Sequence, residues 1–184
     1  MEMFVTSVRI IVVTMLICVA GYASAILGVA LSVPDTARGS LLTASDGRVV
    51  GSRLIAQGFT QPYYFWPRPS AVDYNASAAG GSNKSPTSSD LTERARELIS
   101  RYGASDENPL PAELAAASGA GLDPHITVHA ALYQAKRVAE ARGMPQPIVE
   151  AVIEELAFSP GGFLTTDRLV NVLELNVALD ARRR

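Results

Sequence analysis

The segment FWPRPSAVDYN, residues 65–75, runs directly into ASAAGGSN, residues 76–83, and this joined stretch decides how the chain is organised. Gly, Ser, Asn and Ala dominate its second half, a composition typical of a flexible linker. The first half, however, carries three aromatic residues and places Arg68 between two prolines. Prolines also interrupt any helix across this region. We therefore predict an ordered, extended loop whose aromatic side chains pack against the domain core or a partner.

The residues before this loop predict a strand or a hairpin. Ser45-Asp46-Gly47 is prone to form a turn, and residues 48–57 after it mix β-branched with polar side chains.

Helices are expected after the loop. Asp90 and Glu93 have the spacing of a capping box, and apolar residues then recur with helical period as far as Tyr102, where Gly103 ends the pattern. This predicts a helix over residues 90–102. Three further helices are expected, at 111–117, at 128–141 with Thr127 as N-cap, and at 147–158 after Pro147.

The last segment, residues 167–180, is ambiguous because its apolar residues fit both a strand and a helix. A Thr166-Asp167 cap and a basic end favour the helix. The predicted fold class is therefore α+β, with helices dominant.

The N-terminus contains one long apolar segment, since no charged residue occurs from Ile10 to Pro34. At ~1.5 Å per residue, such a helix reaches across a hydrocarbon core of ~30 Å. A cleaved signal peptide is the alternative, because Ala23-Ser24-Ala25 fits a cleavage site. The apolar run continues through residues 26–31, which favours a membrane anchor.

Flanking charges favour neither orientation. A short N-terminus before a spanning segment usually behaves as an uncleaved signal, so we expect the soluble part outside. The expected organisation is a cytoplasmic segment 1–9, a transmembrane helix 10–34 in contact with membrane lipid, and an extracytoplasmic domain 35–184.

Composition and local motifs argue against several kinds of chemistry. Sixteen basic and 18 acidic residues give a net charge of −2, which leaves no basic field for nucleic acid. The single cysteine, Cys18, excludes an intrachain disulfide. The run Gly80-Gly81-Ser82-Asn83-Lys84-Ser85 resembles a phosphate-binding loop, but Asn83 stands where that motif needs glycine before lysine.

A metal site and a catalytic site also lack support. His125 and His129 have the spacing of a ligand pair with Asp123 nearby, yet they straddle the expected helix start and no third strong ligand is evident. No G-x-S-x-G motif marks a nucleophile. We therefore assign no catalytic residue and no metal ligand. For Arg68 two partners remain open, a carboxylate on another subunit or a group in its own loop.

The N-terminal apolar segment is followed by a set of distinctive stretches in a fixed order: Val50–Phe59, Tyr64-Phe65, Arg68–Ala71, Tyr74-Asn75, Gly80–Asn83, Ala117–Ile126, Gln134 with Arg137-Val138-Ala139, and Val170–Asn176. Through these stretches the chain as a whole resembles one family, the C subunit of the Kdp potassium-transporting ATPase (KdpC). It departs from the family at Ala56, where that family commonly has glycine.

The resemblance implies a subunit of a bacterial inner-membrane complex and not an enzyme in its own right. In such a complex a P-type ATPase subunit hydrolyses ATP, a channel-like subunit binds potassium, and a small Kdp membrane peptide is also present. The family is described as a catalytic chaperone that raises the ATP affinity of the P-type subunit and is needed for assembly and activity. Gln134 matches a glutamine suspected of a nucleotide role.

An extracytoplasmic domain cannot touch cytoplasmic ATP, so we expect ATP to act only through the catalytic subunit, with coupling through the membrane helices. We expect no cofactor bound by the domain itself. The alternatives are an anchored periplasmic ligand-binding or gating module and, with less support, an anchored hydrolase. The candidate interface residues are Tyr64, Phe65, Arg68, Tyr74, Asn75, Gly81, Ser82, Asn83, Asp123 and His125.

Overall fold

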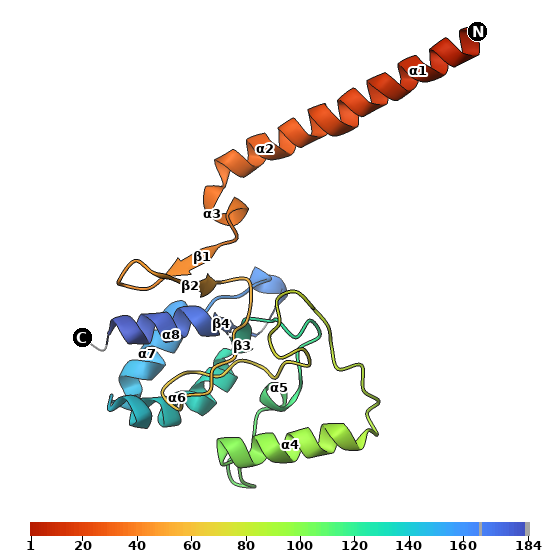
Figure 1. The fold of residues 1–184 in the computed structure, drawn as a ribbon. Helices are drawn as coiled ribbons and strands as arrows, with labels where there is room; N and C mark the ends of the chain where they lie inside the picture. The colour runs from red at the N-terminus through yellow and green to blue at the C-terminus, as the bar shows by residue number, and fades with distance from the viewer. Residues whose placement is uncertain (166, 183–184) are drawn as a thin grey trace. The chain divides into compact units, whose positions relative to one another are not determined.

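The computed structural model describes residues 1–165 and 167–182. The chain divides into two compact units, an N-terminal unit, Met1–Leu41, and a C-terminal unit, Leu42–Arg184. Helices predominate, with two small sheets, so the fold is α+β as predicted (Figure 1).

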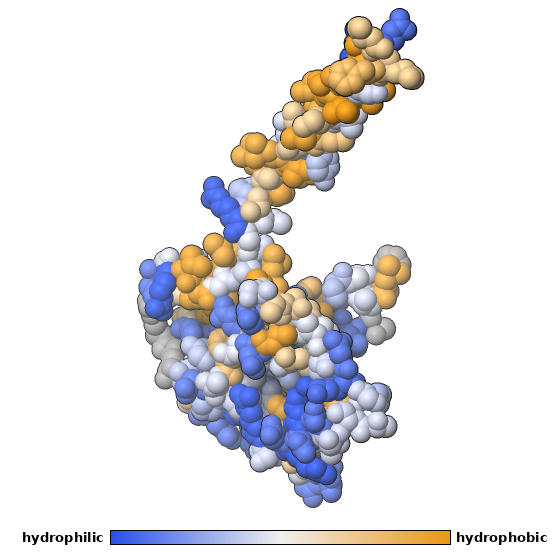
Figure 2. Space-filling view, turned by 45° about the vertical axis from the view of Figure 1, so that its right-hand side comes forward, coloured by the Kyte–Doolittle hydropathy of each residue, from blue (hydrophilic) through white to orange (hydrophobic). Residues whose placement is uncertain are grey.

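The N-terminal unit is one long helical segment followed by a short helix. Helix α1 (Glu2–Met15), a π-helical stretch (Leu16–Gly21) and α2 (Tyr22–Ser32) follow without a break. Apolar side chains cover this segment (Figure 2). Its length and a mean hydropathy of 2.5 suffice to cross a membrane, a property that a signal sequence near the N-terminus shares.

The helical segment begins before the apolar stretch 10–34 and stops just short of its end. It begins at Glu2, because neither Glu2 nor Arg9 disturbs helical geometry. It ends at Ser32, because Val33 takes an extended φ of −130° ahead of Pro34, as expected for a residue before proline. Pro34 then begins the short helix α3 (Pro34–Ala37).

The C-terminal unit has the predicted order of elements, with added strands. Its elements are β1 (Leu41–Thr43), which begins at the boundary, β2 (Val49–Ser52), α4 (Ser89–Tyr102), α5 (Ala112–Ala115), β3 (His125–Thr127), α6 (Val128–Arg142), α7 (Gln146–Leu156), a 3₁₀ turn (Gly162–Leu164), β4 (Leu169–Asn171) and α8 (Val172–Ala181). Strands β1 and β2 form the hairpin expected around Ser45-Asp46-Gly47.

Strand β4 corrects the prediction for residues 167–180. β3 and β4 pair antiparallel with Ile126 opposite Val170. The helix begins only at Val172, because the Asn171 side chain accepts hydrogen bonds from the Leu173 and Glu174 amides and is the true N-cap. Asp167 lies before β4 and outside the helix, and Thr166 lies outside the described residues.

The core is built mainly by α6, α7 and α8, which pack in sequence with β4 against them (Figure 1). Its apolar residues come from these helices, from α5, which contributes Leu114, from both strands of the β3–β4 sheet and from the irregular loop, which contributes Phe65. The predicted cap of α6 is confirmed, since Thr127 Oγ1 accepts from the Ala130 amide.

Helix α4 has no fully buried residue. Its predicted capping box is wrong: Ser88 is the N-cap, and the Asp90 carboxylate instead pairs with Lys84 at 2.5 Å. The hydrogen bond from Lys84 lowers the pKa of Asp90. The predicted end is right, because Gly103 adopts the left-handed conformation that stops the helix.

Candidate functional site

The predicted loop is ordered by side chains that come from helices far away in the sequence. Between β2 and α4 the chain has no regular secondary structure, yet Phe65, Trp66 and Pro67 are buried. Buried peptide groups need hydrogen-bond partners, and here neighbouring strands do not supply them. The partners are the polar side chains of α6 and α8.

Two buried side-chain amides, one on α8 and one on α6, bind the backbone of two successive loop residues. The Asn176 side chain of α8 accepts from the Phe65 amide at 2.8 Å and donates to the Phe65 carbonyl at 3.1 Å. The Gln134 side chain of α6 accepts from the Trp66 amide at 2.9 Å and donates to the Trp66 carbonyl at 3.0 Å. Gln134 is 1% exposed and Asn176 is 2% exposed. We call Gln134 and Asn176 the amide pair.

Two arginines of α6 donate hydrogen bonds to the backbone of the two loop residues before Phe65. Arg137 Nη1 donates to the Tyr64 carbonyl at 3.0 Å, and Nη2 donates to Gln134 Oε1 at 2.8 Å. Arg142 Nε donates to the Tyr63 carbonyl at 2.7 Å. The backbone from Tyr63 to Trp66 is therefore bound residue by residue to α6 and α8.

The Trp66 side chain lies against two guanidinium groups. Arg137 lies 3.7 Å and Arg101 4.0 Å from a ring centroid of the indole, within range of cation–π attraction. The indole packs edge-on against Tyr102 and donates to the Gln61 carbonyl. Burial lowers the pKa of Arg137 to about 10, so this guanidinium stays charged at neutral pH.

The predicted interface residue Tyr64 belongs to a partly buried ion-pair network. Its hydroxyl donates to Asp180 Oδ2 at 3.3 Å, and Asp180 Oδ1 accepts from Arg142 Nη1 at 2.8 Å. The Arg142 side chain is 0% exposed, whereas that of Asp180 is 46% exposed. Burial, and after it the negative charge of Asp180, raises the pKa of Tyr64.

This network predicts a large effect of one neutral substitution. Asp180→Asn leaves the Arg142 guanidinium buried without a counter-charge. We expect it to lower the free energy of unfolding by about 3 kcal/mol, the lower end for a broken buried pair, because Asp180 is half-exposed. The measurement is urea unfolding of the full chain in detergent.

The matched control is Glu155→Gln, which removes the partner of Arg182 at 2.5 Å. Both side chains of that pair are exposed, so we expect a loss below about 1 kcal/mol. Equal losses for the two variants would contradict the role given to the buried Arg142 charge.

The Arg68 guanidinium lies beside a carboxylate of its own chain. Arg68 Nη1 lies 3.4 Å from Asp123 Oδ2, and Nη2 lies 3.5 Å from the Ala117 carbonyl. Asp123 Oδ1 also accepts from the His125 amide at 3.0 Å, and His125 Nδ1 lies 3.3 Å from the same oxygen. The hydrogen bond from the His125 side chain is the largest of the effects that lower the pKa of Asp123. Three predicted interface residues, Arg68, Asp123 and His125, thus form one group, which we call the Arg68 cluster.

Tyr74 and Asn75 turn the chain after this cluster. The Tyr74 hydroxyl donates to the Arg68 carbonyl at 3.0 Å, and its ring covers Gly58. Burial raises the pKa of Tyr74. Asn75 Oδ1 accepts from the amide and the hydroxyl of Ser77, so this side chain stabilises its own exposed turn.

The two glycine-rich stretches of the sequence lie against each other. The Gly80 amide donates to the Ala120 carbonyl at 2.9 Å. A Cβ on Gly81 would lie only 2.8 Å from the Gly119 carbonyl oxygen, which explains the need for glycine there. Ser82 beside it is partly buried, and the exposed Asn83 has a positive φ of 47°.

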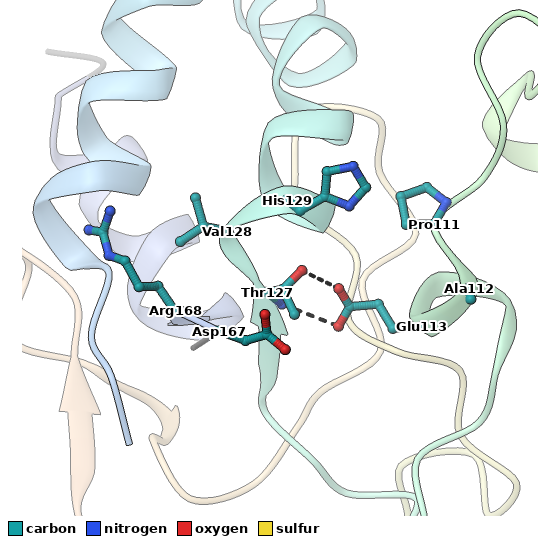
Figure 3. A pocket seen from close by; sticks show the side chains of 8 residues that line it. All are labelled: Pro111, Ala112, Glu113, Thr127, Val128, His129, Asp167 and Arg168. Carbon is teal, nitrogen blue, oxygen red and sulfur yellow. Dashed lines mark hydrogen bonds between the residues drawn. The ribbon is translucent and has the colours of Figure 1, made fainter. Parts of the chain in front are cut away.

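An open pocket of about 560 Å³ lies at the N-terminus of α6 (Figure 3). The Glu113 carboxylate accepts from both the amide and the hydroxyl of Thr127, so both of its oxygens have partners. His129 lines this pocket, whereas His125 lies in β3 beside Asp123. The two histidines do not converge, and within residues 1–165 and 167–182 no group of three or more His, Cys, Asp or Glu is placed to hold a metal.

Sequence reasoning named Gln134 only by resemblance and did not single out Asn176, Arg137 or Arg142 as site residues. Asn176 stands among apolar residues of α8, and Arg142 ends α6 just before Gly143. A polar residue on the apolar face of a helix is the available signal, because buried polar groups require partners. The identity of those partners, 68 residues away for Gln134 and 111 for Asn176, is not encoded locally.

Comparisons with known proteins agree over almost the whole chain. The family model "KdpC: K+-transporting ATPase, c chain" matches residues 4–181. A potassium-transporting ATPase KdpC subunit of Parvibaculum lavamentivorans is 66% identical over 181 residues, covering 98% of this chain and 97% of that protein. The KdpC subunit of Myxococcus xanthus is 46% identical, with 97% and 88% covered. That of Citrifermentans bemidjiense is also 46% identical, with 91% and 90% covered. The chain therefore belongs to the KdpC family.

Proposed function

We propose that this chain is a non-catalytic subunit of a potassium-transporting ATPase complex, in which another subunit hydrolyses ATP. Family membership over residues 4–181 supports the place in the complex. The observation that supports the non-catalytic role is that the polar side chains on the inner faces of α6 and α8 bind the chain's own backbone. Gln134, Asn176, Arg137 and Arg142 each donate a hydrogen bond to a backbone carbonyl of the chain's own loop.

The proposed location is the bacterial inner membrane, with the N-terminus in the cytoplasm and the C-terminal unit outside. The apolar helix Glu2–Ser32 supports a single membrane span. The proposed partners are the P-type ATPase subunit, the channel-like subunit and the small Kdp membrane peptide, which meet this chain through its helix and its loop.

We also propose that any effect on ATP affinity is indirect. The oxygen and the nitrogen of the Gln134 amide both bind the peptide group of Trp66, and the side chain is buried, so a triphosphate has no access to it. Phosphate groups are usually held by a glycine-rich loop or a free helix N-terminus. The Gly80-Gly81 stretch lies against residues 119–120 instead. The chaperone-like effect then reaches the catalytic subunit as a coupling free energy.

Copurification tests the proposed function. The full chain with an affinity tag, solubilised from the membrane of its natural host, is expected to recover a P-type ATPase and a polytopic channel-like protein in equal amounts, together with potassium-stimulated ATP hydrolysis. The control is the same tag on an unrelated single-span protein. Recovery of the chain alone, with potassium uptake unaffected by its deletion, would contradict the subunit role and favour a stand-alone ligand-binding module.

A further inference from the structure

The amide pair joins the core to the predicted interface loop. Asn176 and Gln134 hold the residues Phe65 and Trp66 by the same pattern, one acceptor and one donor on each. A strand partner would use the same two kinds of bond. The two side chains, which come from different helices, therefore make the backbone hydrogen bonds that a neighbouring strand would otherwise make.

The Arg68 cluster lies directly after the residues that the amide pair holds. Arg68 comes two residues after Trp66 and lies 3.4 Å from Asp123. The Pro69 carbonyl accepts from the Ser118 amide at 3.1 Å, and the Arg68 carbonyl accepts from the Tyr74 hydroxyl. Because Pro67 and Pro69 restrict the backbone between these points, a shift of Trp66 moves the Arg68 side chain with it.

We infer that Gln134 and Asn176 are a matched pair of positioning residues, which fix Phe65 and Trp66 and thereby hold the interface loop 68–83 in place. This inference rests on the proposed subunit function. It assigns to Asn176 the same role as Gln134, and it predicts that Gln134 acts on the complex without any contact with nucleotide.

The first test measures the amide pair directly and does not depend on the complex. Gln134→Met and Asn176→Leu keep side-chain volume but remove both hydrogen bonds that each amide makes with the loop, and Gln134→Met also removes the bond from Arg137 Nη2. In the full chain in detergent, we expect hydrogen exchange in a peptide spanning residues 62–68 to become about 10- to 100-fold faster, because each variant leaves buried peptide groups unpaired. Exchange in α7 should not change. Unchanged exchange at residues 62–68 would overturn the inference.

Two gentler variants cover the case in which these substitutions prevent folding. Gln134→Glu and Asn176→Asp keep the shape of each amide: the protonated carboxyl, which burial favours, still accepts from the Trp66 or Phe65 amide and donates to the carbonyl, whereas the ionised form only accepts. We expect each to accelerate exchange less than its apolar counterpart. Equal acceleration by Gln134→Met and Gln134→Glu, or by Asn176→Leu and Asn176→Asp, would contradict the bonding described.

The second test compares the two positions in the purified complex. We measure the apparent KM for ATP, the apparent KM for potassium and kcat of potassium-stimulated ATP hydrolysis. We expect Gln134→Met and Asn176→Leu to change the same constants in the same direction, within about twofold of each other. The double variant should fall short of the product of the single effects, because both act on one segment.

The outcomes separate the explanations. If only Gln134→Met raises the KM for ATP and Asn176→Leu has no effect, Gln134 has a nucleotide role and the inference fails. If exchange accelerates but neither substitution alters any constant, the pair is purely structural and the positioning role fails. If the unsubstituted complex cannot be recovered, the proposed function fails, while the exchange experiment still tests the amide pair.

Discussion

Replacement of residues 1–34 with a cleaved signal peptide is expected to abolish potassium-dependent growth at low external potassium, although the exported C-terminal unit still folds. The core residues all lie beyond Leu41, so folding does not need the helix. The helix itself exposes Ile10, Leu16, Leu27 and other large apolar side chains along its length. Groups of this kind belong in lipid or against other membrane helices.

The measurement is growth of a strain that lacks the natural gene, with the exported unit quantified in the periplasm. The matched control exchanges residues 1–34 for an unrelated single-span helix of the same length. We expect this control to restore membrane location but only part of the activity, because it lacks the small residues Gly21, Ala25 and Gly28, which offer a face on which another membrane helix could pack closely. Full growth with the signal-peptide variant would show that the helix makes no required contact.

Phe65→Ala is the side-chain substitution for which we expect the largest loss of stability. Phe65 is 0% exposed and lies in the same core cluster as Ile153, Leu175 and Leu179. Truncation of a buried phenylalanine removes apolar contacts and leaves a cavity, at about 3–5 kcal/mol. Far-ultraviolet circular dichroism during urea unfolding of the full chain in detergent measures this loss.

Phe158→Ala is the matched control. Phe158 is 40% exposed and contacts the His125 ring at the edge of the β3–β4 sheet. We expect a loss of about 1 kcal/mol or less, because much of the removed surface was already in water. A comparable loss for both variants would mean that Phe65 does not anchor the loop in the core.

The parts of the fold that the sequence predicts are those governed by neighbouring residues. Thr127 is read as an N-cap from its position before an apolar-periodic run, and its side chain caps α6. Gly103 and Gly143 end helices in the left-handed conformation, as their places after periodic segments indicate. The hairpin around Asp46-Gly47 is predicted by turn chemistry.

One error arises where distant residues decide the outcome, and the other where a nearby side chain competes. Val170 satisfies helical spacing with Leu173 and Val177, but pairing with Ile126 places it in a strand, so a tertiary contact overrides local preference. Asp90 fits a capping box, but Lys84, six residues earlier on the loop before α4, binds its carboxylate.

The candidate site shows the same division. Pro67, Arg68 and Pro69 mark an ordered loop, and the structure holds it firmly in place. The sequence leaves open whether Arg68 meets its own chain or another, and the structure shows Asp123 beside it. Gln134 enters only by resemblance, because nothing in a helical pattern reveals that its amide binds Trp66.

The position of Trp66 also makes the chain its own optical reporter. Trp66 is the single tryptophan of the sequence, so ultraviolet-excited indole emission comes from this one place. Trp66 is 7% exposed. A ring centroid of its indole lies 3.7 Å from the Arg137 guanidinium and 4.0 Å from that of Arg101. Emission wavelength and quenching therefore depend on the distance from the indole to Arg101 and Arg137. The isolated natural chain needs no added dye to show, in real time, whether this segment shifts.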